Sequence, residues 1–387
     1  MAFRKKNQFA PIVQNLNMKV LAYFIDSLLN DLASPASQSL LNAIPSLAED
    51  LPGFRHIALT THSDVSLDPG GTLELVQLKV SGSPLMGKQF KKMQAIKKWL
   101  SENQPCAWIT TDPETITADL GIPAIFIANP TGMLSATRKK GMFGKSGAAD
   151  WLSADRIITG SGPAKEQLMQ VHSIPAEKIK VIYPAFEDPV EPLDWGTKEH
   201  VKLRYSSGRD YFMYTGPLAE EQQLIMLLKS YSQLKKWLMT GMPLILAGPA
   251  TEYTATFEKQ LATYKYRSDV SLYPDLAESE CKELVAGAYA LLSPTAANSD
   301  LYPLEWAFSS ETPVIAPENA TYKDLCGDAA MYYIPGDIDS FAHAMMILYK
   351  DENRRTEVIT KGKERSALIN RDNSLKQYRD LILELCG

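Results

Sequence analysis

Two glycines that follow apolar runs, and one glutamate at an expected helix start, are the residues of this sequence whose types and spacing could serve a bound ligand. Gly216 follows the apolar run Phe212–Thr215, and Gly248 follows a second apolar run that starts at Leu244. Glycine at such a turn lets the backbone approach a diphosphate without an intervening side chain, and a helix behind the turn would present free N–H groups to it. Glu305 is an acid at an expected helix start, and taken alone it is best explained as a first-turn acid that stabilises its own helix.

Other patterns with chemical potential favour structural roles. Asp337-Ile-Asp339 resembles a metal-binding pair, but it precedes an expected helix, so we predict an N-cap and no metal. Gly160-Ser161-Gly162 has no partner histidine or acid placed to complete a triad, so we interpret it as a loop. The five histidines are scattered, and no two have the spacing of metal ligands.

The cysteines indicate isolated thiols. None of them forms a CxxC pair, and their wide spacing fits neither a zinc site nor a disulfide framework. We therefore expect unpaired thiols in a reducing cytosol. They are Cys106, Cys281, Cys326 and Cys386.

Length and charge set the broad class. The chain has 387 residues and a net charge of −5, which predicts two domains and argues against a nucleic-acid binder. No clean apolar run follows the basic N-terminus, and Met18–Leu32 is too short and too interrupted to span a bilayer. We expect a cytoplasmic protein, with attachment to the inner face of a membrane as the alternative.

Short apolar runs alternate with helical patterns throughout the chain, which predicts parallel sheets covered on both faces. The expected strands of the first half are Lys19–Ile25, His56–Thr61, Leu73–Val80, Cys106–Thr110, Pro123–Ala128, Arg156–Thr159 and Ile179–Tyr183. Those of the second half are Tyr211–Tyr214, Pro243–Leu246, Val270–Tyr273, Ala290–Leu292, Pro313–Ile315 and Ala330–Tyr333. Pro184–Thr197, rich in proline and acid, is predicted to be a linker.

This organisation predicts two doubly wound α/β domains that face a central cleft at the carboxyl ends of their strands, where open sheets bind ligands. We expect an N-terminal, acceptor-side domain over residues 1–190 and a linker over 191–200. A nucleotide-sugar-binding domain would cover 201–370, and a C-terminal helix over 371–387 would pack back on the first domain.

Several segments together resemble the family-4 (group 1) glycosyltransferases of the GT-B fold. Phe212-Met-Tyr-Thr-Gly-Pro-Leu and Leu244–Pro249 are similar to the two strand-and-glycine turns of that family. Ala290-Leu-Leu-Ser-Pro-Thr, Tyr302-Pro-Leu-Glu-Trp-Ala-Phe and Thr312-Pro-Val-Ile follow its signature block. The similarity covers about residues 154–365 and is architectural before that.

The resemblance implies a retaining, hexosyl-type transferase. It would move a sugar from a nucleotide-diphospho-sugar to an acceptor (a glycan, a lipid or a protein) without a metal or other cofactor. Electrostatic stabilisation of the leaving diphosphate would carry the catalysis. The donor contacts implied are Thr215, Gly216, Gly248, Tyr273, Asp275, Leu276, Asn298, Ser299, Asp300, Tyr302 and Glu305. On the acceptor side we expect Asn129, Arg138, Lys139 and Lys140.

The sequence departs from the family pattern where charge matters. Pro217 stands where the family has an arginine. Glu220 and Glu221 stand near the position, at the start of the next helix, where the family has a lysine. Ala297 replaces the first of two paired glutamates, with Asn298 or Asp300 as substitutes, and no histidine follows the strand that ends before Asn129. Carboxylates there would repel a diphosphate. A second hypothesis is therefore a catalytically inactive GT-B-like binding or scaffold subunit of an active transferase; a third is an epimerase or phosphorylase.

Two basic segments leave alternatives open. Lys88–Leu100 has lysines beside an apolar face, which suits either a peripheral membrane contact or a helix packed on the sheet with a solvated face. The basic loop Arg138–Lys145 can bind an anionic acceptor or partner, or it is a solvated loop.

Overall fold

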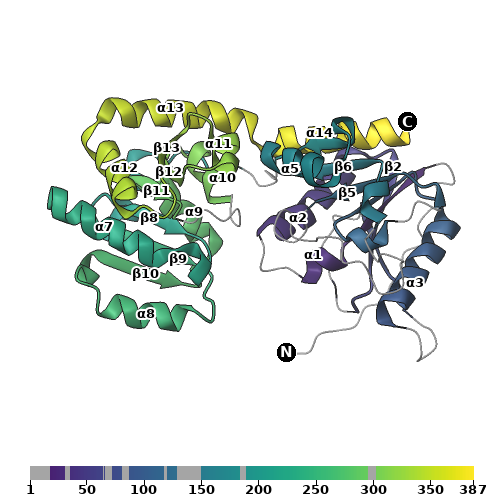
Figure 1. Cartoon of the computed structure of the whole chain (residues 1–387), viewed down its shortest axis with the longest axis horizontal. Helices are drawn as coiled ribbons and strands as arrows, with labels where there is room; N and C mark the ends of the chain where they lie inside the picture. Colours follow the sequence, from purple (N-terminus) through teal and green to yellow (C-terminus); the bar gives the residue numbers. More distant parts are fainter. Residues whose placement is uncertain are drawn as a thin grey trace.

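The protein has two lobes, each built on a parallel sheet, which lie side by side (Figure 1). The computed structural model describes residues 18–30, 35–63, 65, 72–80, 87–116, 120–128, 150–183, 189–294 and 302–387. The expected α/β architecture with two doubly wound domains is confirmed within these residues.

The N-terminal lobe contains a seven-stranded sheet in the order β3-β2-β1-β4-β5-β6-β7. Its strands are β1 (Lys19–Phe24), β2 (Phe54–Thr60), β3 (Leu73–Gln77), β4 (Ala107–Thr110), β5 (Ala124–Ile127), β6 (Arg156–Thr159) and β7 (Ile179–Val181). Its helices are α1 (Asp26–Asn30), α2 (Pro35–Asp50), α3 (Lys88–Asn103) and α5 (Gly162–His172), with the short turns η1 (Pro113–Thr115), η3 (Asp150–Ser153) and η4 (Ala176–Lys178).

Alternating side chains of β1 divide the core of this lobe into two layers. Leu21 and Tyr23 pack toward α2, whereas Ala22 and Phe24 pack toward α3 and α5. This follows from the two-residue period of a strand, and it leaves both faces of the sheet covered, as is usual for parallel strands. The segment Lys88–Leu100 was expected either to contact a membrane or to pack on the sheet. It forms part of α3, which packs on the sheet, because Ile96 is completely buried in the second layer.

His56 is buried in β2 and bonded on both ring nitrogens. Its Nε2 donates to the Leu51 carbonyl oxygen at 3.1 Å, so Nδ1 accepts from the Tyr23 hydroxyl at 3.0 Å. Because a carbonyl can only accept, the Leu51 bond fixes a proton on Nε2, and in the neutral ring Nδ1 is then the acceptor. Burial lowers the pKa of His56 below its usual range, although the bond to Leu51 opposes this.

The C-terminal lobe contains a six-stranded parallel sheet in the order β10-β9-β8-β11-β12-β13. Its strands are β8 (Phe212–Thr215), β9 (Leu244–Gly248), β10 (Val270–Pro274), β11 (Ala290–Leu292), β12 (Val314–Pro317) and β13 (Ala330–Tyr333). Its helices are α6 (Trp195–Ser206), α7 (Leu224–Leu238), α8 (Thr254–Ala262), α9 (Glu278–Gly287), α10 (Tyr302–Ser309), α11 (Ala320–Cys326), α12 (Ile338–Lys350) and α13 (Glu352–Leu368), with the short turns η5 (Glu220–Gln222) and η6 (Arg267–Asp269).

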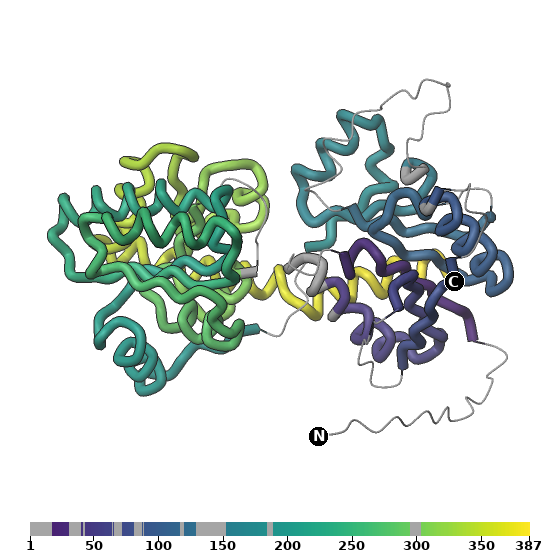
Figure 2. The backbone as a smooth tube through the Cα atoms, turned by 90° about the horizontal axis from the view of Figure 1, so that it is seen from below, coloured from purple at the N-terminus to yellow at the C-terminus, as the bar shows by residue number. Residues whose placement is uncertain are grey.

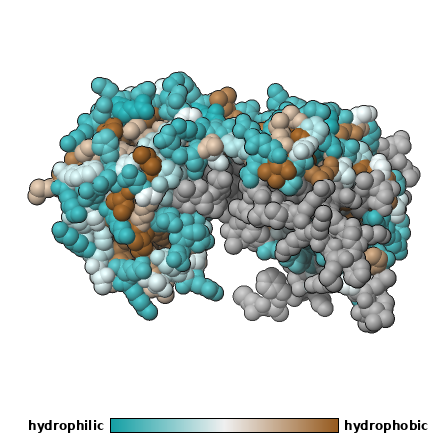
Figure 3. Space-filling model, in the orientation of Figure 1, coloured by the Kyte–Doolittle hydropathy of each residue, from teal (hydrophilic) through white to brown (hydrophobic). Residues whose placement is uncertain are grey.

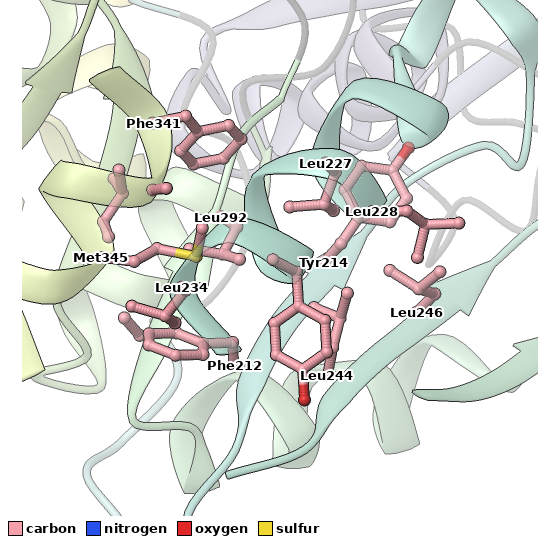
Figure 4. Close-up of a cluster of buried hydrophobic side chains, with 14 of the residues drawn as sticks. Phe212, Tyr214, Leu227, Leu228, Leu234, Leu244, Leu246, Leu292, Phe341 and Met345 are labelled. Carbon is pink, nitrogen blue, oxygen red and sulfur yellow. The ribbon is translucent and has the colours of Figure 1, made fainter. Parts of the chain in front are cut away.

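A large apolar layer holds α7 and α12 against one face of this sheet. Phe212 and Leu244 of neighbouring strands meet Leu227 of α7 and Phe341 of α12 in that layer (Figure 4). All four side chains are completely buried. A second layer on the opposite face joins the sheet to α6, α9, α10 and α11. The sheet is therefore fixed from both sides, which makes its carboxyl edge a rigid platform.

Two helix boundaries differ from the sequence prediction. The expected linker over 191–200 is shorter, because Asp194 caps α6: its carboxylate accepts from the Thr197 N–H at 3.1 Å, and the helix begins at Trp195. The composition of Glu220–Leu238 predicts one continuous helix, but α7 begins only at Leu224. The η5 turn precedes it, and Gln223 has a left-handed φ of 57°.

The last helix, α14 (Arg371–Cys386), returns to the N-terminal lobe (Figures 1 and 2). It packs against α2 and buries Tyr378 and Ile382 in the first core layer. A disulfide joins Cys106 to Cys386 with their Cα atoms 5.2 Å apart. The expectation of isolated thiols is therefore wrong for this pair. The two cysteines are 280 residues apart, and only the return of α14 brings them together.

The two lobes meet at a contact between α5 and α11. The Gly162 N–H, at the start of α5, donates to the Asp324 carboxylate at 2.9 Å. The Ser161 hydroxyl accepts from the Ala164 N–H at 3.3 Å, so Ser161 of the Gly160–Gly162 segment is the N-cap of α5. Arg365 lies over the Tyr183 ring at 5.6 Å. Burial, and then the nearby Asp324 carboxylate, raise the pKa of Tyr183.

Hydrophilic residues cover most of the described surface in Figure 3, and hydrophobic residues form small separate patches. The apolar side chains that face solvent include Trp195 and Met239, 80% and 89% exposed. Among the described helices, none combines the length and the apolar character that crossing a membrane requires.

Candidate functional site

Two glycine turns meet at the carboxyl edge of the C-terminal sheet. Gly216 directly follows β8 and has φ 148°, and Gly248 ends β9 with φ 141°. A Cβ atom on Gly248 would lie 2.2 Å from the Gly216 carbonyl oxygen. The two turns are in direct backbone contact, and the Gly216 N–H donates to the Ala247 carbonyl at 3.1 Å. Only glycine fits at position 248.

The loop after Gly216 is bonded to the loop after Gly248. The Leu218 N–H donates to the Pro249 carbonyl at 2.9 Å, and the Thr251 hydroxyl donates to the Leu218 carbonyl at 2.6 Å. The Tyr214 hydroxyl donates to the Pro217 carbonyl at 2.8 Å. These bonds fix both loops before any ligand binds, so a ligand at this edge would meet a preformed backbone surface.

The Thr215 side chain points into the domain. It is 8% exposed and forms a hydrogen bond with the Cys281 thiol, whose pKa is raised by burial. The predicted donor contact at Thr215 is therefore available through its backbone, beside the Gly216 turn.

The segment with the expected donor contacts Tyr273 and Asp275 lies next to the Gly248 turn. Asp275 follows β10 with a left-handed φ of 55°. Its N–H donates to the Gly248 carbonyl at 2.9 Å, and its carboxylate accepts from the Ala250 N–H at 2.8 Å. Tyr273 packs edge-on against Tyr205 at 5.5 Å. Tyr273 and Asp275 are thus brought to the same edge as the glycine turns.

Leu276, just before α9, and Glu305, in α10, flank the same edge. Leu276 packs on the second core layer, and its carbonyl accepts a long 3.9 Å contact from the Cys281 thiol. Glu305 lies in the first turn of α10 and is only 7% exposed. Its place at the start of α10 brings a carboxylate to the same sheet edge as the glycine turns.

The remaining predicted site residues cannot be placed with these. Asn298, Ser299 and Asp300 on the donor side lie outside the described residues. The same is true of Asn129, Arg138, Lys139 and Lys140 on the acceptor side. Tyr302 begins α10, but its side chain is outside the description.

The sequence around Gly216 carries acid where an anion would be held. No lysine or arginine occurs between Gly216 and Leu228, and both Glu220 and Glu221 are exposed. The Glu220 charge also acts on Tyr253 at the start of α8. Burial is the main cause of the raised pKa of Tyr253, and the Glu220 charge raises it further. The charge on this segment therefore opposes a diphosphate, while its backbone geometry favours one.

Asp337 takes the structural role that its position predicts. Its carboxylate accepts from the N–H groups of Asp339 and Ser340 at 2.9 and 3.0 Å. These bonds make it the N-cap of α12, as expected from an acid directly before a helix.

The N-terminal sheet also carries polar side chains that the sequence analysis did not single out. Asp26, directly after β1, is 2% exposed. It accepts from the Thr60 hydroxyl and the Thr61 N–H, both at 2.8 Å, and Lys92 lies 3.6 Å from it. An acid immediately after a buried strand was the available signal, because the carboxyl ends of parallel strands gather at one edge.

Comparisons with known proteins agree with this arrangement. Residues 197–365 match the family model of glycosyl transferases group 1. The O-antigen chain mannosyltransferase RfbU of Salmonella typhimurium is 23% identical over 189 residues, 49% of each chain, so the match spans about half of that curated relative.

Solved structures resemble nearly the whole chain. A glycosyltransferase from Rickettsia africae has a TM-score of 0.75 at 11% identity and covers 95% of this chain and 99% of its own. Anabaena HepE, solved with UDP and glucose, has a TM-score of 0.70 at 13% identity and covers 95% of this chain and 100% of its own. At these identities the likeness shows the fold, which is the two-domain GT-B fold.

Proposed function

Because residues 197–365 of this chain belong to group 1 of the glycosyl transferases, we propose that it transfers a sugar from a nucleotide-diphospho-sugar to an acceptor. The donor binds at the carboxyl edge of the C-terminal sheet, and the acceptor binds on the N-terminal lobe. The reaction is of the retaining, hexosyl type and uses no metal. The similarity of the fold to HepE, which was solved with UDP and glucose, supports a donor of this class.

The contact between Gly216 and Gly248 is the observation that carries this proposal. The two turns pack so closely that a Cβ atom on Gly248 would lie 2.2 Å from the Gly216 carbonyl oxygen, and neither strand end carries a side chain at its glycine. Such a surface accommodates phosphate oxygens. Glu305 then lies at the next helix start, where it can receive the ribose hydroxyls of the donor.

The missing cations set the expected affinity. A hydrogen bond to a charged group contributes about 1.5–3 kcal/mol, so the loss of one cation weakens donor binding roughly 10- to 100-fold. We therefore expect nucleotide binding in the high micromolar to millimolar range. Stabilisation of the leaving diphosphate depends on backbone N–H groups and the helix dipole.

A thermal-shift screen tests donor binding directly. UDP, GDP, ADP and their sugars are added at millimolar concentration, and a ligand that binds only the folded chain must raise the melting temperature. Release of nucleotide diphosphate from the sugar donor, with and without EDTA, then tests transfer and the absence of a metal. If none of these nucleotides raises the melting temperature, the chain is not a nucleotide-sugar transferase.

The second candidate is an inactive binding or scaffold subunit that works with an active transferase. The observation that favours it is the acidic segment after Gly216. The double variant Pro217→Arg with Glu221→Lys restores the two family charges. If the site is a donor site weakened only by charge, this variant binds nucleotide diphosphates about 10-fold more tightly or better. If it binds no better than the native chain, and the native chain releases no nucleotide diphosphate, the scaffold function holds.

A further inference from the structure

The chain passes between the two lobes at two places that lie side by side. At the first, Ile182 is buried in the core of the N-terminal lobe, whereas Tyr183 packs against the second layer of the C-terminal lobe. At the second, Ile369 packs on that same C-terminal layer, and α14 then begins at Arg371. The Ser374 hydroxyl donates to the Tyr183 carbonyl at 2.7 Å. The first turn of α14 is therefore part of the hinge between the lobes.

α14 extends from this hinge along the N-terminal lobe (Figure 2). Its 16 residues form a rod about 24 Å long. Arg371 in its first turn donates to the Ser46 hydroxyl of α2 at 2.8 Å, and Glu384 in its last turn pairs with Arg156. A rod that is held only near the hinge can pivot there, whereas a second fixed point at its far end sets its direction. The attachment of the last turn therefore decides how firmly α14 holds the lobes together.

The disulfide supplies this second fixed point. Cys386 is the last residue of α14. Cys106 stands directly before β4, and its N–H donates to the Val20 carbonyl of β1 at 2.8 Å. Lys19, the first residue of β1, also donates to the Cys386 carbonyl oxygen. The far end of α14 is thus joined to β1 and β4, the neighbouring strands at the centre of the sheet.

The two sulfur atoms of this disulfide differ in their access to solvent. Cys106 is partly exposed, whereas Cys386 is only 5% exposed. A small thiol therefore reaches the bond at the Cys106 sulfur. The apolar contacts of Tyr378 and Ile382 with the core hold α14 on the lobe independently of the disulfide. Reduction therefore loosens the helix without releasing it.

The other two cysteines of the chain do not compete with this pair. Cys281 and Cys326 are 4% and 0% exposed in the C-terminal lobe. Burial raises the pKa of both thiols, and the thiolate is the form of cysteine that reacts. A thiol that acts on the folded chain therefore reacts first with the disulfide of Cys106 and Cys386.

We propose that Cys106 and Cys386 form a reversible thiol–disulfide switch that sets how firmly α14 holds the two lobes together. The thiolate of a small thiol such as glutathione attacks the Cys106 sulfur, and Cys386 leaves as a thiolate and takes up a proton. A second glutathione thiolate attacks the mixed disulfide, which releases Cys106 to take up the second proton and forms oxidised glutathione. Two glutathione molecules thus supply the two electrons, and oxidised glutathione reverses the reaction.

The consequence of this switch for activity rests on the proposed function. Transfer requires that a donor on one lobe meet an acceptor on the other, and a small misplacement of reacting groups lowers the rate strongly. The contact between Gly216 and Gly248 lies wholly within the C-terminal lobe, so nucleotide binding does not depend on α14. We expect the reduced chain to transfer sugar about 10-fold more slowly than the oxidised chain, with an unchanged affinity for nucleotide.

The first experiment asks which cysteines react in the folded chain. The native chain is oxidised, then treated with reduced glutathione, labelled with a maleimide and analysed by mass spectrometry. Labels should appear on Cys106 and Cys386 only after reduction, and Cys281 and Cys326 should stay unlabelled. Addition of oxidised glutathione should restore the disulfide.

The second experiment measures hydrogen exchange of α14, residues 371–386, which needs no activity. Exchange should be at least about 10-fold faster in the reduced chain than in the oxidised chain. The double variant Cys106→Ser with Cys386→Ser should exchange like the reduced chain whether or not glutathione is present. Cys281→Ala is the matched control, because it removes a cysteine outside the pair and should respond to glutathione like the native chain.

Any of three results would overturn the inference: a disulfide that glutathione reduces only after unfolding, equal exchange of α14 in the two states, or a response to glutathione by the double serine variant. None of these results bears on nucleotide binding, so the proposed function would stand. Equal transfer rates in the two states, with a loosened α14, would overturn the link to activity. If α14 responds to reduction in a chain that neither binds nucleotide nor transfers sugar, the switch stands and the transferase does not.

Discussion

Replacing Gly248 with alanine changes the contact on which the donor site depends. In the native chain Gly248 has φ 141°, and its position allows no Cβ because the Gly216 carbonyl oxygen would lie 2.2 Å away. The added methyl group must push the two turns apart or force the backbone out of this conformation. Either response breaks the Gly216 N–H bond to Ala247, which is 3.1 Å long.

The size of the effect follows from two contributions. A non-glycine residue in a strained backbone region costs about 1–3 kcal/mol, and one lost backbone hydrogen bond costs about 0.5–1.5 kcal/mol. We therefore expect Gly248→Ala to lower the free energy of unfolding of the C-terminal domain by about 3 kcal/mol. For a domain of this size that lowers the melting temperature by about 6–12 °C.

Calorimetry of native and variant chains measures this, and the nucleotide thermal shift measures the consequence for the site. Gly241→Ala is the control, because a Cβ there meets nothing within 4 Å; it should melt like the native chain. We expect Gly248→Ala to melt lower and to lose its nucleotide shift. A melting temperature equal to that of the control would refute the close-contact argument.

Three further predictions concern features away from the donor site. Because burial lowers the pKa of His56, the unfolded chain binds more protons below about pH 6.5, and stability falls as the pH is lowered through that value; urea midpoints at pH 7.5 and 5.5 should differ less for His56→Gln than for the native chain. Asp324→Asn weakens the 2.9 Å bond from Gly162 and should increase the radius of gyration in small-angle scattering; an unchanged radius would mean that this contact does not hold the lobes. The double replacement of Cys106 and Cys386 with serine should lower the melting temperature under non-reducing conditions by removing a cross-link worth at most about 5 kcal/mol, and the difference should vanish in excess dithiothreitol.

The sequence was most informative where local pattern determines structure. Apolar runs bounded by turn residues predicted strands such as Arg156–Thr159 and Ala330–Tyr333 with the ends that the structure has. Asp337 was recognisable as a cap because capping depends only on the next few residues. The start of α7 was missed by four residues, because Glu220 to Gln223 suit a helix by composition but form a separate turn.

Contacts between distant segments were out of reach of the sequence. No pattern shows that Cys106 and Cys386 meet, since their pairing depends on the path of α14. The same applies to Lys92, which lies near one face of an amphipathic helix and could not be assigned to Asp112 without the sheet order. Gly248 could be predicted to form a turn, but its contact with Gly216 depends on the register of β8 and β9.

The course of α14 has a consequence for the order in which the protein matures during synthesis. The N-terminal lobe is made before the C-terminal lobe, yet its apolar layer includes Leu375, Tyr378 and Ile382, which are made after the C-terminal lobe. The C-terminal lobe takes its core from a continuous stretch of the chain and can complete it earlier. Until α14 has been made and has packed, the N-terminal lobe exposes apolar surface beside α2, and we expect chaperones to bind there.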